Sequence, residues 1–185
     1  MKQVLIVLIF LSAQLAKAQE EKGISVKPVR IPFTLEAGHS AIQTVHIINH
    51  TDKPTNFKLY FEDWRRDSFG MKRYYYPGVY KRSCANWLKI NKDNVVVDPG
   101  KTEDVLVRME LPDDPKAVEE MKWTMLFVAT IPENKGASKF TGLRTEVGNI
   151  IRIAVQITQT PPNITEKDIQ MLSFGNTPGE ERKYR

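Results

Sequence analysis

Hydrophobic and polar residues alternate with a period of two along most of the chain, the pattern of half-buried β-strands. Each alternating run is short and is bounded by Gly, Pro, Asn or Asp, as at the Pro99-Gly100 turn. Only residues 113–121 suggest a turn or two of helix. Seven or eight strands without a long helix indicate an antiparallel β-sandwich, with an immunoglobulin-like fold as the leading option. We expect strands within residues 24–33, 42–49, 55–64, 85–90, 94–98, 103–111, 122–131 and 148–157.

The alternation changes parity inside the first of these runs, at Pro28. Proline cannot donate a hydrogen bond to a strand ladder, so a bulge or bend is expected there. A bend would point the apolar residues on both sides inward, and a first strand that crosses from one sheet to the other is common in sandwiches. Arg30 follows the bend and is either a solvated charge on an edge strand or a residue that grips a ligand. The apolar residues concerned are Ile24 and Val26 before the bend, and Val29, Ile31 and Phe33 after it.

Residues 1–18 have the layout of a secretory signal peptide. Lys2 precedes an apolar run, and Ala16-Lys17-Ala18 forms a cleavage site; an uncleaved anchor is the alternative. No later segment is long and apolar enough to span a bilayer, so we expect a periplasmic or otherwise exported protein without membrane insertion. Residues 19–160 form one predicted domain. Residues 161–185 are expected to be a linker and tail, or the start of a missing second domain.

Charge and cysteine content limit the possible partners. Removal of Lys2 and Lys17 with the signal leaves 25 basic against 22 acidic residues, a net charge near +3 that does not by itself argue for nucleic acid or membrane. Cys84 is the one cysteine, so no internal disulfide can form and the domain must rely on its core. Cys84 itself is expected to be a small buried apolar residue, with intermolecular pairing as the alternative.

No motif for catalysis is found in the sequence. It has no G-x-S-x-G elbow, phosphate loop or dinucleotide loop. His46 and His50 are four residues apart, but they lie in a strand and a turn, where helical metal-ligand spacing does not apply. We therefore predict a protein-binding domain that is not an enzyme and has no metal, cofactor, small-molecule substrate or nucleic-acid partner.

Residues 62–83 break the alternation and form a basic tyrosine-rich segment, in which residues 68–72 suggest a hairpin tip. One interpretation is a solvated hairpin whose tyrosines partly cover a sheet face. The other is a partner surface, since Arg and Tyr favour protein interfaces; its candidate contacts are Arg65, Arg66, Arg73 and Tyr75. The segment also contains Lys72, Lys81, Arg82, Tyr74, Tyr76 and Tyr80.

The order of these features resembles the amino-terminal domain of periplasmic pilus chaperones, the PapD-like family. Residues 24–33 are similar to the family's first strand with its basic residue, and "VHIINHTDKP" is similar to its second strand ending in Asn. Residues 90–111 resemble its strand, Pro-Gly turn and strand, "WTMLFVATIPEN" the strand that ends in Ile-Pro, and residues 149–157 the last strand with a second basic residue. The resemblance covers about residues 24–160. "SCANWLKI" and the basic segment look more like Bacteroidota relatives.

The resemblance implies a chaperone-like role in the assembly of surface or secreted proteins. In the family, one basic residue of the first strand and one of the last bind the terminal carboxylate of a client subunit; these positions correspond to Arg30 and Arg152. The adjoining segment is lent to the client as an added strand, here with Leu143 and Val147 as its apolar contacts. The chaperone role is favoured if the side chains of Arg30 and Arg152 lie within a few ångström of each other on one exposed face. It fails if one of them is buried against a local acid or if the two point apart.

Two features depart from the family pattern. Thr145 and Gly148 interrupt the alternation of the donated segment. The family also has a second domain, with the client carboxylate in the cleft between the two, so this chain is either a fragment or a one-domain relative. The alternative function is a structural or adhesive component of a cell-envelope assembly that binds through residues 62–83.

Overall fold

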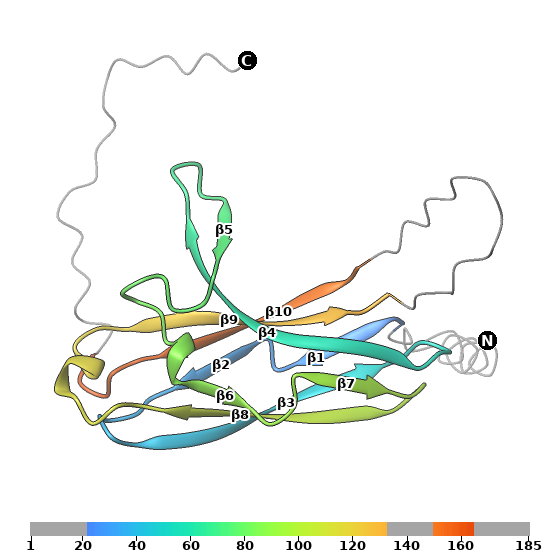
Figure 1. The fold of residues 1–185 in the computed structure, drawn as a ribbon, viewed down its shortest axis with the longest axis horizontal. Coiled ribbons are helices and arrows are strands. Elements are labelled where there is room, and N and C mark those ends of the chain that lie inside the picture. The colour runs from blue at the N-terminus through green and yellow to red at the C-terminus, as the bar shows by residue number, and fades with distance from the viewer. Residues whose placement is uncertain (1–21, 133–149, 165–185) are drawn as a thin grey trace, which may run out of the picture.

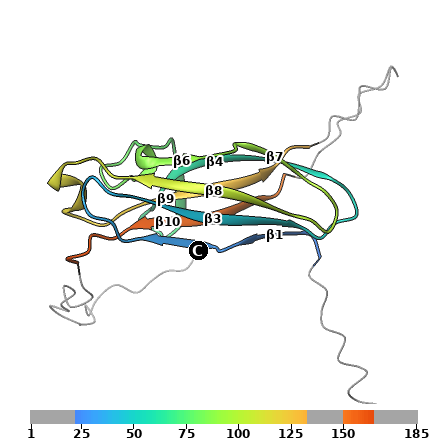
Figure 2. The same cartoon turned by 90° about the horizontal axis from the view of Figure 1, so that it is seen from below.

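The chain folds into two β-sheets that pack face to face (Figures 1 and 2). The structure is a computed structural model that describes residues 22–132 and 150–164. The predicted signal peptide and most of the tail therefore lie outside the described residues. The strands are β1 Ile24–Lys27, β2 Arg30–Phe33, β3 Ser40–Asn49, β4 Thr55–Arg66, β5 Lys72–Tyr75, β6 Leu88–Ile90, β7 Asn94–Val97, β8 Thr102–Glu110, β9 Lys122–Thr130 and β10 Arg152–Gln159.

One sheet has the strand order β1-β3-β8-β6 and is the nearer layer in Figure 2. The other has the order β2-β10-β9-β4-β5, with β7 also paired to β4. All strand pairs are antiparallel except β2 with β10. The predicted β-sandwich is confirmed. The strands of the described residues outnumber the seven or eight expected because the first run is split in two and the basic segment adds β5.

The first strand crosses between the sheets as predicted. β1 pairs with β3, whereas β2 pairs with β10 in the other sheet. The Lys27–Pro28 peptide, which is cis, lies between the two strands. Val26, Ile31 and Phe33 are buried on opposite sides of the bend. The expectation for Val29 was wrong: it lies in the bend itself and is 61% exposed.

The core lies between the sheets and is almost entirely aliphatic. Val45 of β3 lies opposite Val105 of β8, and both are fully buried. Val155 and Ile157 of β10 face them from the other sheet, as the alternation predicts. Cys84 belongs to the same cluster, so its predicted burial is confirmed.

Strand β9 is buried on both faces. Leu126 and Val128 belong to the core cluster, whereas Phe127 points to the outer face of the sheet with Ala154 and Tyr60 beside it. Phe127 is nevertheless only 4% exposed, because side chains of the neighbouring strands and of the hairpin cover it. A strand covered on both faces has an almost continuous apolar sequence. The sequence therefore does not show which alternate residues of β9 face the core.

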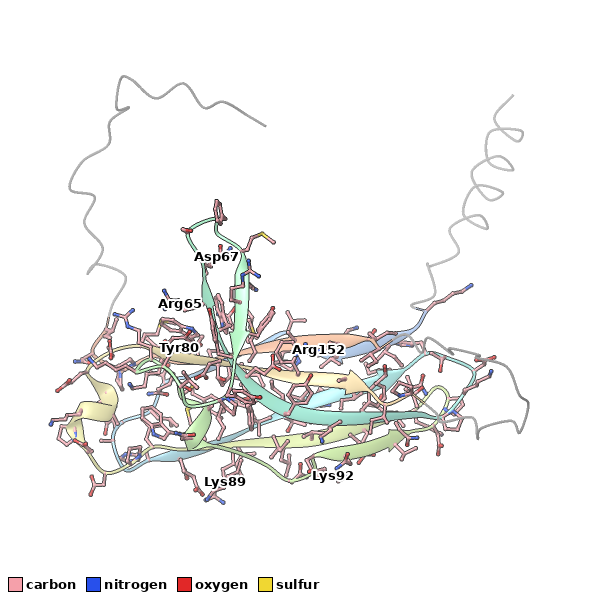
Figure 3. The ribbon with its side chains drawn as sticks, turned by 45° about the horizontal axis from the view of Figure 1, so that its top comes forward. Arg65, Asp67, Tyr80, Lys89, Lys92 and Arg152 are labelled. Atoms are coloured by element: carbon pink, nitrogen blue, oxygen red, sulfur yellow. The ribbon has the colours of Figure 1, made fainter. Side chains whose placement is uncertain are left out.

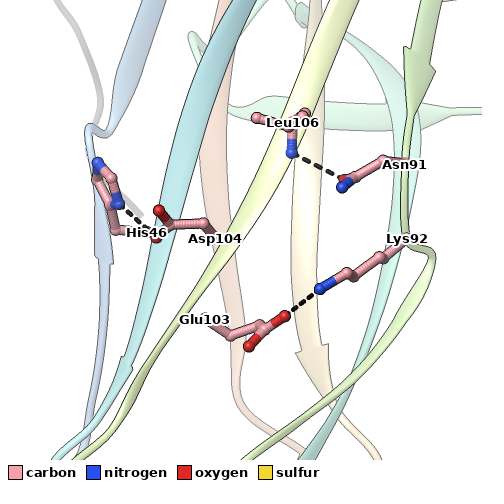
Figure 4. Close-up of polar contacts among 6 residues, drawn as sticks. All are labelled: His46, Asn91, Lys92, Glu103, Asp104 and Leu106. Carbon is pink, nitrogen blue, oxygen red and sulfur yellow. Dashed lines mark hydrogen bonds and ion pairs between the residues drawn. The ribbon is translucent and has the colours of Figure 1, made fainter.

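Polar side chains close the ends of the strands. Asn49 is fully buried, and its amide nitrogen donates to the carbonyls of Lys53 and Val97. On the outer face of the first sheet, the side-chain oxygen of Asn91 accepts the Leu106 N–H beyond the end of β6 (Figure 4).

Helical structure is short in the part of the chain described. Residues Ala85–Trp87 and Pro115–Val118 form single 3-10 turns, and the second lies where a short helix was expected. The side chain of Asp114 accepts the Lys116 N–H and caps that turn. No helix within residues 22–132 and 150–164 has the length and apolarity to cross a membrane.

Candidate functional site

Arg30 lies at the first position of β2, on the outer face of the second sheet. Its side chain lines a shallow pocket of about 360 Å³ together with Gln156, and Pro32, Thr158 and Met121 complete the walls. Arg30 forms no ion pair with any other described residue. The guanidinium group is therefore exposed and available to an anion.

The strand register places Gln156, and not Arg152, opposite Arg30. Arg152 lies four residues before Gln156 on β10, a separation of about 13 Å at the rise of a strand. Both arginines lie on the outer face, because Gln156 and Arg152 have the same parity. The expectation that their side chains lie within a few ångström of each other is therefore wrong. Alternation alone could place both on one face, but the register of β2 against β10 was not readable from the sequence.

Arg152 is held by its own surroundings. Its Nη2 donates to the Glu62 carboxylate at 2.8 Å. Its guanidinium carbon lies 4.2 Å from the Phe127 ring centroid and 5.5 Å from that of Tyr60. A guanidinium group that already has a carboxylate partner and two aromatic neighbours is poorly placed to bind another anion. Its partner-binding role stays a prediction, and the structure offers Gln156 as the nearer companion of Arg30.

Half of β10 presents an open edge among the described residues. β9 pairs with the whole of β10, but β2 pairs only with residues 156–159. Thr130 and Ile151 form a hydrogen-bonded pair, so every second residue from Ile151 directs its backbone groups toward β9. The backbone groups of Arg152 and Ala154 consequently point toward the open side. The backbone of Gln156 points the same way, and its N–H donates to the Val29 carbonyl just before β2 begins to pair with β10.

Apolar residues surround the start of this open edge. Ile131, Ile150 and Ile151 are large, exposed apolar side chains at the ends of β9 and β10. Leu143 and Val147, the predicted apolar contacts of a lent strand, lie in the segment 133–149 outside the described residues. Their role stays a prediction.

The basic tyrosine-rich segment forms a hairpin that projects from the second sheet (Figures 1 and 3). β4 continues to Arg66, and β5 pairs back along it, so the predicted tip at residues 68–72 is confirmed. Tyr74 packs edge-on against Phe127 with ring centroids 5.1 Å apart, which agrees with tyrosines that partly cover a sheet face. Tyr75 packs edge-on against Tyr80.

The three arginines predicted as partner contacts all lie on this hairpin. The Arg65 guanidinium stacks over the Tyr80 ring at 5.5 Å. Arg66 donates to the Gly70 carbonyl at 2.7 Å, and Arg73 pairs with Asp67 at 2.9 Å. Their contacts are local and exposed, and their role in partner binding stays a prediction.

Asp63 organises the return from the hairpin, and it was not singled out from the sequence. It is only 2% exposed. Its carboxylate accepts hydrogen bonds from the backbone of Val79, the Ser83 hydroxyl at 2.5 Å and the Thr124 hydroxyl at 3.3 Å. Because a buried carboxylate is stable only when its oxygens are bonded, Asp63 fixes the loop that follows β5. A pocket of about 240 Å³, lined in part by Trp64, Trp123, Arg65 and Arg82, lies beside it.

Glu120 partners the two cations of the loop after the hairpin, Lys81 and Arg82. Arg82 Nε lies 2.9 Å and Lys81 Nζ 3.2 Å from its carboxylate. These cations, the Lys81 hydrogen bond above all, hold the pKa of Glu120 below its ordinary value against the opposing effect of desolvation. One carboxylate shared by two cations leaves this loop a smaller excess of positive charge than the hairpin, where residues 65–73 carry four cations and one acid.

Several solved structures of fimbrial chaperones are similar to this chain. A chain of the chaperone–tip adhesin complex of CFA/I fimbriae biogenesis aligns with a TM-score of 0.52 and 11% identity over 75% of this chain and 56% of that one. The E. coli chaperone DraB aligns with a TM-score of 0.51 and 11% identity over 80% of this chain and 61% of its own. The Salmonella enterica SafA pilin–SafB chaperone complex gives 0.52 and 10% over 86% and 67%.

The chain therefore spans less than two thirds of the length of the first two of these proteins. No protein-family model and no curated protein matches the sequence. Identities of 10–11% establish the fold and nothing finer. The chain has the PapD-like immunoglobulin-like fold that its sequence pattern resembles.

Proposed function

We propose that this protein is an exported, non-enzymatic chaperone-like factor that binds a client protein by strand addition and carboxylate anchoring. It would assist the assembly of surface or secreted proteins in the periplasm. The observation that supports the proposal most directly is the open half-edge of β10, which ends at the exposed guanidinium of Arg30.

The bend at Pro28 creates this arrangement. The chain runs through it from β1 in the other sheet to β2, so among the described residues, residues 152–155 of β10 have no strand on one side. An extended client segment that bonds to Arg152 and Ala154 would lie in line with β2. If it runs parallel to β10, its carboxyl end arrives where β2 begins, beside Arg30.

Arg30 and Gln156 have suitable chemistry for that end. A guanidinium group binds a carboxylate through two parallel hydrogen bonds. The amide of Gln156, one strand away, offers a further donor from the same pocket wall. An arginine plus an amide gives an anion site with one net positive charge in place of the two-cation site that Arg30 and Arg152 would have formed.

The SafB and CFA/I structures were solved with a pilin and with a tip adhesin, respectively. A client of the same kind is proposed here: an envelope protein with an incomplete sheet and a free carboxyl terminus. A structural or adhesive role through residues 62–83 is the second candidate, and the projection of the hairpin from the sheet favours it.

A pull-down from an envelope extract tests the chaperone role. Arg30→Ala removes the anchor, and Ala154→Pro removes a backbone donor on the open edge without removing a bond to β9. A charge-assisted hydrogen bond contributes about 1.5–3 kcal/mol, so Arg30→Ala should bind clients roughly 10-fold to 150-fold more weakly. A neutral backbone hydrogen bond contributes about 0.5–1.5 kcal/mol, so Ala154→Pro should weaken binding roughly 2-fold to 10-fold. Recovery of client proteins is measured by quantitative mass spectrometry against the wild-type protein.

Arg108→Ala is the matched control, because Arg108 is an exposed arginine on the other sheet, paired with Glu110 at 2.8 Å. It should leave recovery unchanged. Equal recovery with the wild-type protein, Arg30→Ala and Ala154→Pro would refute client binding at this edge. Loss with Ala154→Pro alone would keep strand addition and remove the carboxylate anchor from the proposal.

A further inference from the structure

The hairpin of β4 and β5 contains pairs of opposed like charges, which destabilise it and which the packing of the two sheets does not require. Its arms place Arg65 directly opposite Arg73, and Arg66 directly opposite Lys72. Like charges in directly opposed positions destabilise a strand pair. Residues 65–73 contain these four cations and one acid, Asp67, so they have a net charge of +3 within nine residues.

The acid serves mainly to shape the tip. One carboxylate oxygen of Asp67 accepts the N–H groups of Phe69 and Met71, both at 3.0 Å, and the other pairs with Arg73. The Asp67 N–H and the Met71 carbonyl close the turn at 2.9 Å. Gly70 has a φ of +78°, which a residue with a side chain rarely adopts. The tip is therefore an ordered turn and not a loose loop.

The ordered tip holds two apolar side chains in solvent. Phe69 is 88% exposed and Met71 is 62% exposed. Figure 3 shows the hairpin rising from the sheet, with Asp67 near its end and Arg65 closer to its base. Apolar groups thus occupy the extremity, and the four cations follow within a few residues on both arms.

We infer that this hairpin docks on the surface of an anionic phospholipid bilayer. Phe69 and Met71 would enter the boundary between headgroups and acyl chains, at a depth of about 5–10 Å. Arg65, Arg66, Lys72 and Arg73 would then lie at the level of the lipid phosphates, which would relieve the repulsion between the opposed cations.

The layered order of the residues favours a bilayer over an acidic protein. A projecting tip is the first part of the molecule to reach a planar membrane. The apolar tip residues can then reach the acyl chains, while the cations behind them meet the layer of negatively charged headgroups. The contact is peripheral, involves no spanning segment and is independent of the open edge of β10, so it stands or falls separately from client binding.

Vesicle flotation tests the inference with the full chain. The probes are phosphatidylcholine vesicles with and without about 30% phosphatidylglycerol, at about 0.1 M salt. The protein should float with the anionic vesicles and not with the neutral ones. Each cation near an anionic surface contributes about 1 kcal/mol, so Arg65→Gln with Lys72→Gln should weaken binding about 30-fold. Phe69→Ser with Met71→Ser should weaken it as well.

The charge variant removes one cation from each opposed pair, so its thermal midpoint should stay near that of the wild-type protein, and loss of binding cannot then be attributed to unfolding. Lys89→Gln with Lys92→Gln is the matched control. These lysines pair with Glu110 and Glu103 and lie on the side of the molecule away from the hairpin (Figure 3), and their loss should not affect flotation. A second readout is quenching of Phe69→Trp fluorescence by brominated lipids, which should exceed that of the native tryptophans.

Three results would overturn the inference. One is equal binding to neutral and anionic vesicles. Another is unchanged binding of the Phe69→Ser, Met71→Ser variant, which would make the hairpin a site for soluble polyanions or acidic proteins. The third is an equal loss in the lysine control, which would indicate attraction by net charge alone.

Discussion

Asp63 and Cys84 show how burial changes the meaning of a residue type. Nothing in the sequence singles out Asp63, yet its carboxylate accepts hydrogen bonds from the loop after β5. Cys84 follows that loop and is fully buried among core side chains. Burial, and to a lesser extent the negative charge of Asp63, raises the pKa of the Cys84 thiol to about 12. A thiol with so high a pKa is neutral at physiological pH and poorly nucleophilic.

The thiol should therefore be unreactive in the folded protein, and its ionisation should destabilise the fold. We expect a thiol reagent at pH 8 to modify Cys84 only after unfolding in urea. The folded pKa of about 12 lies above the ordinary thiol pKa of 9.0, so the contribution of Cys84 to stability is complete below about pH 9 and is lost as the pH rises toward 12.

The slope of unfolding free energy against pH should be smaller in Cys84→Ala over this window. That comparison removes the effect of tyrosines and lysines that titrate in the same range. Rapid modification of the folded protein at pH 8 would contradict the burial of Cys84.

Strand β10 has two halves with different neighbours, and this asymmetry carries the proposed function. Its second half is covered by β2 on one side and β9 on the other, whereas β9 is the one neighbour of its first half within the part of the chain that the structure describes. Neighbouring residues of the first half therefore direct their backbone N–H groups to opposite sides of the strand. Ala154 directs its N–H to the open edge, and Val155 directs its N–H to Leu126 of β9.

Proline substitution distinguishes the two directions. Ala154→Pro should change the free energy of unfolding by less than about 1 kcal/mol, because no ladder bond is removed. Val155→Pro should cost about 3 kcal/mol or more, because it removes a bond to β9 in the core. Val155→Ala separates the loss of the bond from the loss of the side chain. Equal costs for both prolines in urea titrations would show that the register of β10 is different.

At the scale of the whole molecule, two sheets without a disulfide depend on one aliphatic core. Cys84 is the only cysteine, and the buried side chains come from all but one of the strands, the exception being β5, which has no buried residue. The hairpin stands outside this core and makes its own contacts, chiefly stacking of cations on aromatic rings. The sandwich should therefore tolerate changes in the hairpin far better than changes between the sheets.

Two leucines test this division. Leu126→Ala removes a fully buried side chain between the sheets and should lower the free energy of unfolding by about 2–5 kcal/mol. Leu106→Ala, on the exposed face of β8 where Leu106 is 42% accessible, should cost less than about 1 kcal/mol. Urea unfolding monitored by tryptophan fluorescence measures both. Similar costs would place the core elsewhere.

The sequence by itself determined the fold class, the crossing of the first strand and the position of the hairpin tip. These features depend on local signals: a period of two, a proline at a parity break, and Gly70 in a turn. The burial of Cys84 followed in the same way from its apolar neighbours. The same signals misjudged Val29, because a bend moves the residue beside it away from either sheet, and they could not identify the inward face of β9, which is covered on both sides.

The tertiary structure alone decided which residues meet. Arg30 and Arg152 have the right parity for one face, but a difference of four residues in register separates them and places Gln156 beside Arg30. Register is set by how two distant strands pack in the core, and nothing in either segment encodes it. The same is true of Glu62, which neutralises Arg152 from a position 90 residues away in the chain. Period and composition are local properties of the chain, whereas a binding site is a property of contacts between its distant parts.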